Sequence, residues 1–144
     1  MRILLDVNIL VRANERSHGS ARAVLLTLIE QGHTLLISRE MLVELAAVLR
    51  YPRLQNLYGL TEEQIYHYVL FLQEVSEIVS LDHALPVPIR DPKDITVLQT
   101  AFIGEADIIC TLDSDFYSTE TMTFCTVLGM EICTDVELAG KIKV

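Results

Sequence analysis

The sequence predicts a three-layer α/β/α sandwich built around a central, mainly parallel β-sheet. Short apolar runs of strand length recur along the chain, and amphipathic helical patterns separate them from end to end. Strands that alternate with helices form βαβ units, whose parallel sheet is covered by helices on both faces. The length of 144 residues and the lack of repeats predict a single domain over residues 1–144.

The first strands and the first helix lie in the N-terminal part of the chain. Residues 3–5 and 34–37 are short apolar runs that predict buried strands. Between them, the apolar spacing predicts an amphipathic helix over residues 20–31, with Ser20 as its N-cap and Gly32 just beyond its end.

Capping residues mark the next two helices. Ser38 is expected to cap a helix that runs to residue 50, and Pro52 is expected to close it. The series Thr61-Glu62-Glu63-Gln64 is typical of a capping box and predicts a helix over residues 61–77.

The C-terminal half completes the predicted sheet. Residues 81–89 contain two prolines and are expected to form an extended linker. Pro92 then stands at the first position of a helix that runs to residue 103. Strands are expected over residues 107–111 and 130–133.

The composition excludes several classes of protein. Hydrophobic residues make up 51% of the chain, which excludes a disordered protein. No apolar run approaches the ~20 residues of a membrane span, and Asp6 comes too early for a signal peptide. We therefore expect a cytoplasmic protein without membrane contact. An odd number of cysteines, without close pairing, predicts that Cys110, Cys125 and Cys133 are buried, reduced thiols.

The net charge of −9 does not favour nucleic-acid binding, because affinity for phosphates comes mainly from Lys and Arg. A nucleic-acid enzyme is compatible with this charge in two ways. Either the acids are concentrated in a site that bound cations neutralise, or a basic patch or partner supplies the attraction.

Carboxylates follow two of the predicted strands at their carboxyl ends. Asp6 comes directly after the first strand, and Asp113 follows the third strand by two residues. In open parallel sheets, ligands bind beyond this edge. Asn8 and Asp115 each follow at a spacing of two residues, which keeps them near the same edge.

Glu44 and Asp94 add carboxylates from two helices. Glu44 shares a helix face with an apolar stripe, where a lone carboxylate needs a compensating partner. The stripe consists of Met41, Ala47 and Val48. Alternatively, Glu44 is partly exposed beside the core. Asp94 lies in the first turn of its helix, where an acid can also serve only to complement the helix dipole.

A group of four or more carboxylates cannot stay ionised close together unless cations neutralise it. Hard divalent cations, Mg²⁺ or Mn²⁺, are therefore the expected cofactors. Such a site suits hydrolysis of phosphodiester bonds, in which one metal activates water and a second stabilises the leaving oxygen. The four histidines are scattered without metal-ligand spacing, so we do not expect them in the site.

Four segments together resemble the PIN-domain family. They are Leu4-Leu5-Asp6-Val7-Asn8, Leu36-Ile37-Ser38 through Glu44-Leu45, Arg90-Asp91-Pro92-Lys93-Asp94, and Ala106-Asp107 through Thr111-Leu112-Asp113-Ser114-Asp115-Phe116. The segments occur in the family's order over residues 1–120 and look closest to the VapC-type branch of toxins from toxin–antitoxin systems. The sequence departs from this branch at Leu112, where its members often have Gly or a polar residue.

The resemblance implies a metal-dependent endoribonuclease, the toxin component of a toxin–antitoxin pair, whose products carry 5′-phosphate and 3′-hydroxyl ends. It implies as catalytic and metal-binding residues Asp6, Glu44, Asp94 and Asp113. It implies accessory roles for Asp91 and Asp115 and polar supporting roles for Asn8, Ser38 and Thr111. Alternatively, the last three form only an Asx turn, an N-cap and a strand-end hydroxyl, in that order.

The expected partners are an RNA substrate, an antitoxin protein and a second copy of the chain. Candidate RNA-binding residues are Arg12, Arg50 and Arg53, together with Arg16, Arg90 and Tyr51, although each is alternatively a solvated surface group. The predicted helix over residues 61–77 carries more apolar side chains than one core face needs, which favours a homodimer. Alternatively, the monomer itself covers this helix on both sides.

Three other functions remain open from the sequence. A phosphatase or phosphotransferase of the haloacid-dehalogenase type also uses acids after parallel strands, but its first motif has a second acid where this chain has Asn8. A receiver-type signalling domain would have paired acids after the first strand and would leave Glu44 unexplained. A PIN domain without catalysis would act only as a binding module for RNA or protein.

Overall fold

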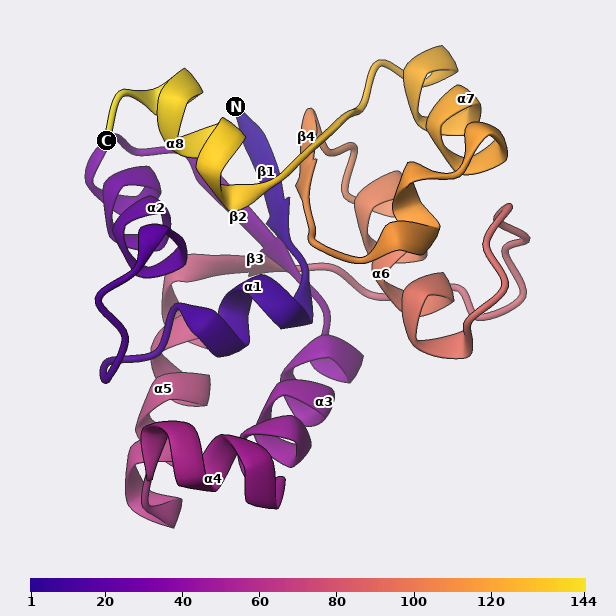
Figure 1. The fold of residues 1–144 in the computed structure, drawn as a ribbon. Coiled ribbons are helices and arrows are strands. Elements are labelled where there is room, and N and C mark those ends of the chain that lie inside the picture. The colour runs from indigo at the N-terminus through magenta and orange to yellow at the C-terminus, as the bar shows by residue number, and fades with distance from the viewer.

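The computed structural model describes residues 1–144 and contains one five-stranded sheet in which all neighbouring strands are parallel (Figure 1). The strand order is β3-β2-β1-β4-β5. The strands are β1 (Arg2–Leu5), β2 (Thr34–Ile37), β3 (Ser76–Ile78), β4 (Ile108–Cys110) and β5 (Glu131–Cys133). Helices flank this sheet, so the predicted α/β class is confirmed.

Eight α-helices and one 3₁₀ helix connect the strands or follow the last of them. They are α1 (Val7–Arg12), α2 (Ser20–Glu30), α3 (Arg39–Leu49), α4 (Pro52–Tyr58), α5 (Glu62–Val75), α6 (Pro92–Ile103), η1 (Ser114–Tyr117), α7 (Thr119–Val127) and α8 (Asp135–Ile142). α2 packs against α8, and α3 packs against both α1 and α5. None of these helices is long and apolar enough to cross a membrane.

The central strands lie in the middle of the hydrophobic core. Ile3 and Leu4 of β1 and Ile109 of β4 have no exposed surface. A continuous cluster of 38 buried hydrophobic residues surrounds them. Burial on both faces explains why these strands are unbroken apolar runs rather than alternating patterns. The core therefore fixes the positions at which the chain leaves β1 and β4.

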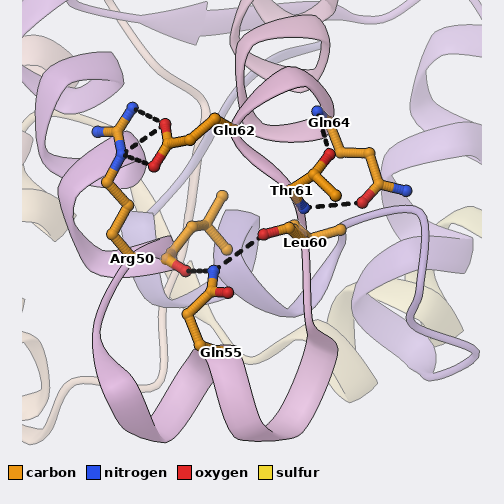
Figure 2. A network of polar contacts seen from close by, with 7 residues as sticks. Arg50, Gln55, Leu60, Thr61, Glu62 and Gln64 are labelled. Carbon is orange, nitrogen blue, oxygen red and sulfur yellow. Dashed lines mark hydrogen bonds and ion pairs between the residues drawn. The ribbon is translucent and has the colours of Figure 1, made fainter.

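Three helices begin where the sequence predicts. The Ser38 side chain caps α3 and accepts a hydrogen bond from the backbone N–H of Met41 at 3.4 Å. Thr61 and Gln64 form a reciprocal capping box at the start of α5 (Figure 2). Pro92 is the first residue of α6. The Ser38 and Thr61 side chains accept from backbone N–H groups that a helix leaves free at its start, and Pro92 has no N–H to satisfy there.

The start of α2 differs from the prediction. Gly19 is the N-cap residue, and Ser20 is the first residue of the helix. The Ser20 hydroxyl donates a hydrogen bond to the buried carboxylate of Asp135 in α8. This contact joins segments that are 115 residues apart, and it prevails over the local capping preference of serine.

The prediction of a helix over residues 61–77 is wrong at its end. α5 stops at Val75, and Ser76–Ile78 form the edge strand β3, which is missing from the prediction. Ser76 lies opposite Leu35 of β2 in the parallel register. A strand of three residues has no periodicity of its own, so the pairing with β2 decides its structure.

Pro52 ends one helix and also begins another. α3 stops at Leu49, close to the predicted end, but Pro52 is the first residue of α4, which the prediction lacks. Figure 2 shows how α4 is attached to its neighbours. The Nε2 of Gln55 donates to the carbonyl oxygens of Leu49 at 2.9 Å and Leu60 at 3.0 Å. One side chain thus joins α3, α4 and the segment that leads into α5.

The three cysteines are buried and unpaired, as the sequence predicts. Cys110 and Cys133 lie opposite each other in the register of β4 and β5. Burial raises the pKa of the Cys125 thiol to about 11. Thiols in such surroundings are poor nucleophiles and act as small core residues.

Candidate active site

The chain leaves β1 and β4 side by side, and a carboxylate follows each strand. The N–H of Asp6 donates to the carbonyl of Cys110 at 2.9 Å and so continues the pairing of β1 with β4. Asp113 caps η1 shortly after β4. The helices that carry Glu44 and Asp94, α3 and α6, contact each other and begin beside the same edge (Figure 1).

These acids line a common pocket of about 180 Å³, which we call the acidic pocket. Its lining residues are Asp6, Val7, Asn8, Val11, Glu44, Val48, Asp91, Lys93, Asp94 and Asp113. Half of them are Asp or Glu, and Lys93 is the only cationic residue among them. All four acids predicted for metal binding are therefore brought together, and their negative charge exceeds the positive charge in the pocket.

Asp6 is buried and is held by three hydrogen bonds. Only 4% of its surface is exposed. Its Oδ1 accepts from the N–H of Val7 at 2.7 Å. Its Oδ2 accepts from the hydroxyl of Thr111 at 2.6 Å and from the amide of Asn8 at 3.3 Å. Burial raises the pKa of Asp6 to about 6, even though the bonds from Thr111 and Val7 lower it. Asn8 and Thr111 thus hold this carboxylate in one orientation.

The loop after β4 is built on the same two polar side chains. The Thr111 hydroxyl oxygen accepts from the N–H of Asp113 at 3.0 Å, and Asn8 Oδ1 accepts from the N–H of Leu112 at 3.3 Å. Asp113 Oδ1 accepts in turn from the N–H of Asp115 at 2.9 Å. Leu112, which departs from the family pattern, is 39% exposed and does not line the acidic pocket. Its side chain therefore does not fill the pocket.

Glu44 reaches the acidic pocket from the middle of α3. Its side chain is 23% exposed, and the Nζ of Lys93 lies 3.9 Å from its Oε1. Burial raises the pKa of Glu44, the charge of Lys93 lowers it, and the charge of Asp91 raises it. At the start of α3, the buried hydroxyl of Thr100 in α6 donates to the Ser38 hydroxyl at 3.0 Å. Ser38 therefore holds α3 against α6, and its side chain forms no hydrogen bond with an acid of the pocket.

Asp94 has the least satisfied carboxylate of the site. The residue is 5% exposed, and its Oδ2 is buried without a hydrogen-bond partner. Burial raises the pKa of Asp94 to about 8, and the neighbouring Asp113 contributes to the rise. An unpartnered carboxylate oxygen in the interior carries a large desolvation cost. The geometry therefore favours a proton or a cation beside this oxygen.

Asp91 and Asp115 extend the cluster of acids toward solvent. Carboxylate oxygens of Asp91, Asp94 and Asp115, one from each residue, lie within 4.8 Å of one another. Asp91 also caps α6, and its Oδ1 accepts from the N–H of Lys93 at 3.0 Å. Asp91 and Asp115 are exposed, whereas Asp94 is buried. These three residues form a second group of oxygen donors that shares Asp91 and Asp94 with the acidic pocket.

The arginines predicted for RNA binding lie outside the acidic pocket. Arg50 is paired with Glu62, with its Nε 2.9 and 3.0 Å from the two carboxylate oxygens and its Nη2 2.8 Å from one of them (Figure 2). Arg53 in α4 and Arg12 at the end of α1 are exposed. Lys93 was not predicted as a site residue, although a basic residue between acids in the first turn of α6 is a signal for one.

Known proteins match this chain in sequence pattern and in fold. The family model of the PIN domain matches residues 2–115. A search of curated proteins gives no significant match. Among matching solved structures is VapBC2 from Rickettsia felis bound to a DNA fragment from their promoter, with 18% identity and a TM-score of 0.56, covering 81% of this chain and 91% of the matched chain. Another is FitAcB from Neisseria gonorrhoeae, with 16% identity and a TM-score of 0.53. The match covers 93% of this chain and 98% of the matched chain. At these identities the likeness is one of fold.

Proposed function

This chain belongs to the PIN-domain family, and from that premise we propose that it is an endoribonuclease that hydrolyses RNA phosphodiester bonds with Mg²⁺ or Mn²⁺. The observation that carries the proposal is the buried Oδ2 of Asp94, which has no hydrogen-bond partner inside a cluster of carboxylates. We further propose that residues 1–144 form a single nuclease domain.

The donor set fits a hard divalent cation. Every acidic side chain of the cluster offers carboxylate oxygens, which Mg²⁺ and Mn²⁺ prefer over nitrogen or sulfur. We assign metal binding to Asp6, Glu44, Asp94 and Asp113, with Asp91 and Asp115 as accessory residues. When bound, the cation activates water for attack on the phosphate and stabilises the leaving oxygen.

The chain's own groups prepare this site before substrate arrives. Asn8 and Thr111 fix the carboxylate of Asp6, so little reorganisation is needed when charge develops in the transition state. Without a cation, a proton on the carboxyl of Asp94 relieves its repulsion with Asp113. A cation bound at Asp94 would compete with that proton, so metal affinity would depend on pH.

The proposal predicts that the purified protein cleaves RNA with Mg²⁺ or Mn²⁺ and that EDTA stops the cleavage. Labelled RNA is followed on denaturing gels, and the product ends are expected to be 5′-phosphate and 3′-hydroxyl. Cleavage that continues in EDTA contradicts the proposal. A phosphorylated aspartate trapped on the protein supports the haloacid-dehalogenase alternative instead, and metal binding without cleavage supports an inactive binding module.

We also propose that this nuclease is the toxin of a toxin–antitoxin pair and acts in the cytoplasm. The support is the resemblance of its four acidic segments to VapC-type toxins, together with the fold likeness to chains of VapBC2 and FitAcB. The VapBC2 structure contains promoter DNA. An antitoxin protein would then bind this chain and restrain its cleavage of RNA.

Self-association is a further expectation, and it concerns helix α5. This helix buries Ile65, Tyr68 and Leu72 but leaves Tyr66 62% and Leu70 38% exposed. A groove of about 450 Å³, lined mostly by apolar side chains, lies between α3 and α5. Exposed apolar surface of this kind marks interaction sites. Analytical ultracentrifugation is expected to show a homodimer, whereas a monomer at high micromolar concentration contradicts this expectation.

A further inference from the structure

Lys93 is the only cationic residue that lines the acidic pocket. It lines the acidic pocket together with five carboxylate side chains. These are Asp6, Glu44, Asp91, Asp94 and Asp113. Its side chain is 62% exposed, and its Nζ lies 3.9 Å from Oε1 of Glu44. The ammonium group is therefore at the mouth of the pocket and is free to move on its flexible stem.

The position of Lys93 is unfavourable for the stability of its helix. It is the second residue of α6, in the first turn. The helix dipole places partial positive charge at this end, which favours acids such as Asp94 and disfavours a lysine. The pair with Glu44 does not offset this, because a long contact to an exposed ammonium contributes little. Local rules that are broken beside a site indicate a functional role.

The negative charge of the molecule indicates what Lys93 can do in the pocket. RNA must bring a phosphate into a pocket of carboxylates in a protein with a net charge of −9. None of the arginines predicted for RNA binding lines this pocket, and Arg90 lines a neighbouring pocket together with Asp115. An ammonium is a compact charge with three N–H donors that bind phosphate oxygens in any direction. Lys93 is placed to reach a phosphate that enters the same pocket.

We propose that Lys93 binds a non-bridging oxygen of the RNA phosphate that enters the acidic pocket, and that it rests beside Glu44 when RNA is absent. This inference rests on the proposed ribonuclease function. It has two consequences of opposite sign. Removing the charge weakens RNA binding, because a phosphate contact is lost. The same change strengthens binding of divalent cations in the absence of RNA, because the ammonium no longer competes for the carboxylate of Glu44.

The test compares Lys93→Met, which keeps an unbranched apolar side chain but removes the charge, with Lys93→Arg. The matched control is Lys143→Met, which removes one positive charge at the exposed C-terminal end of α8. RNA affinity is measured by fluorescence anisotropy of a labelled oligoribonucleotide with Mg²⁺, in an Asp113→Asn background that prevents cleavage. Mg²⁺ affinity is measured without RNA, from the rise in melting temperature of proteins that keep Asp113.

Lys93→Met is expected to weaken RNA binding about tenfold. The plot of the logarithm of the RNA association constant against the logarithm of the salt concentration should become less steep by about 0.7, the value for one phosphate contact of a single strand. Mg²⁺ affinity should rise severalfold, Lys93→Arg should keep most of the RNA affinity, and Lys143→Met should change neither. The inference is overturned if Lys93→Met binds RNA with the same affinity and salt slope as Lys143→Met, or if Mg²⁺ affinity falls together with RNA affinity.

Failure of the inference is distinguishable from failure of the proposed function. If the parent protein cleaves RNA and Lys93→Met binds RNA like the control, the role of Lys93 is wrong and the nuclease stands. If the parent protein neither binds nor cleaves RNA, both are wrong. Circular dichroism of Lys93→Met is expected to match that of the parent, because the exposed ammonium contributes little to the fold.

Discussion

Replacing any one of the four acids proposed as metal ligands with its amide is expected to lower RNA cleavage by about 10²-fold or more. These acids are Asp6, Glu44, Asp94 and Asp113. An amide keeps the shape of the side chain but removes the negative charge that would hold the cation. The loss should appear in kcat, because the cation acts on the reacting phosphate rather than on the remainder of the RNA. Initial rates with labelled RNA measure the effect.

The fold should survive these changes. Each amide fills nearly the same volume as the acid and reduces repulsion in the acidic pocket. Asp94→Asn is the clearest case, because the Oδ2 that becomes an amide group has no hydrogen-bond partner to lose. Without metal at pH 8, this variant is expected to melt at a higher temperature than the parent protein. An inactive variant that is also more stable cannot owe its inactivity to unfolding.

Two control variants test whether the loss of cleavage is specific to the four proposed metal ligands. Glu74→Gln removes the same charge from an exposed position of α5 and should leave cleavage unchanged. Asp115→Asn should cost less than loss of Asp113, because Asp115 is exposed and belongs only to the outer group of acids. Cleavage that persists in Asp6→Asn would show that the acidic pocket is not the catalytic site.

The elements that position the site were predictable where local chemistry decides them. Ser38 and Pro92 begin α3 and α6, and these helices bring Glu44 and Asp94 to the carboxyl edge of the sheet. The strand ends place Asp6 in the same way, because an unbroken apolar run ends where the acid begins. In these segments local preference and tertiary packing favour the same structure.

The elements that were not predicted depend mainly on contacts between segments that are distant in the sequence. Strand β3 exists because Ser76 pairs beside Leu35, and α2 begins one residue early because Ser20 bonds to Asp135. The short helices α1, α4 and α7 also begin with local signals, which are the N-caps Asp6 and Ser118 and the first-turn residue Pro52. Their few residues give little periodicity, so packing decides that they are helical. Helix α8 begins with the capping box of Thr134 and Glu137, a local signal from which it was predictable.

Two features of the site were also beyond the reach of sequence reasoning. The pattern of acids does not show that Oδ2 of Asp94 lacks a partner, because that depends on how β4 and α6 are packed. Nor does it show that Lys93 lies beside Glu44 on another helix. The arginines predicted for RNA binding lie outside the acidic pocket, with Arg50 paired to Glu62 and Arg90 in a neighbouring pocket that Asp115 also lines.

The second large effect expected is on stability, which should depend on pH in the absence of metal and on Mg²⁺ at high pH. Burial raises the pKa of Asp6 from 3.8 to about 6, and burial together with Asp113 raises that of Asp94 from 3.8 to about 8. Glu44, which faces Lys93 and Asp91, also has a raised pKa. The folded protein therefore binds more protons than the unfolded chain between about pH 4 and pH 8.

This difference in bound protons sets the direction in which stability changes with pH. Stability of the metal-free protein should be highest near the acidic end of the window and fall as the pH rises from about 5.5 to about 8, because folding then forces ionised carboxylates together. A cation replaces the missing protons. Mg²⁺ at about 100 times its dissociation constant stabilises the fold by about 2.7 kcal/mol. For a chain of this size, that raises the melting temperature by about 5–10 °C.

The measurement is a set of melting curves at several pH values with Mg²⁺ or with EDTA. The gain from Mg²⁺ should be near its full size at pH 8 and small at pH 5.5, where protons compete with the cation for Asp94 and Asp6. Asp94→Asn should flatten the pH dependence in EDTA and remove most of the gain from Mg²⁺, whereas Glu74→Gln should change neither. A metal-free protein whose melting temperature rises steadily from pH 5.5 to pH 8, or one that Mg²⁺ does not stabilise at pH 8, would rule out a cluster of buried carboxylates that requires a cation.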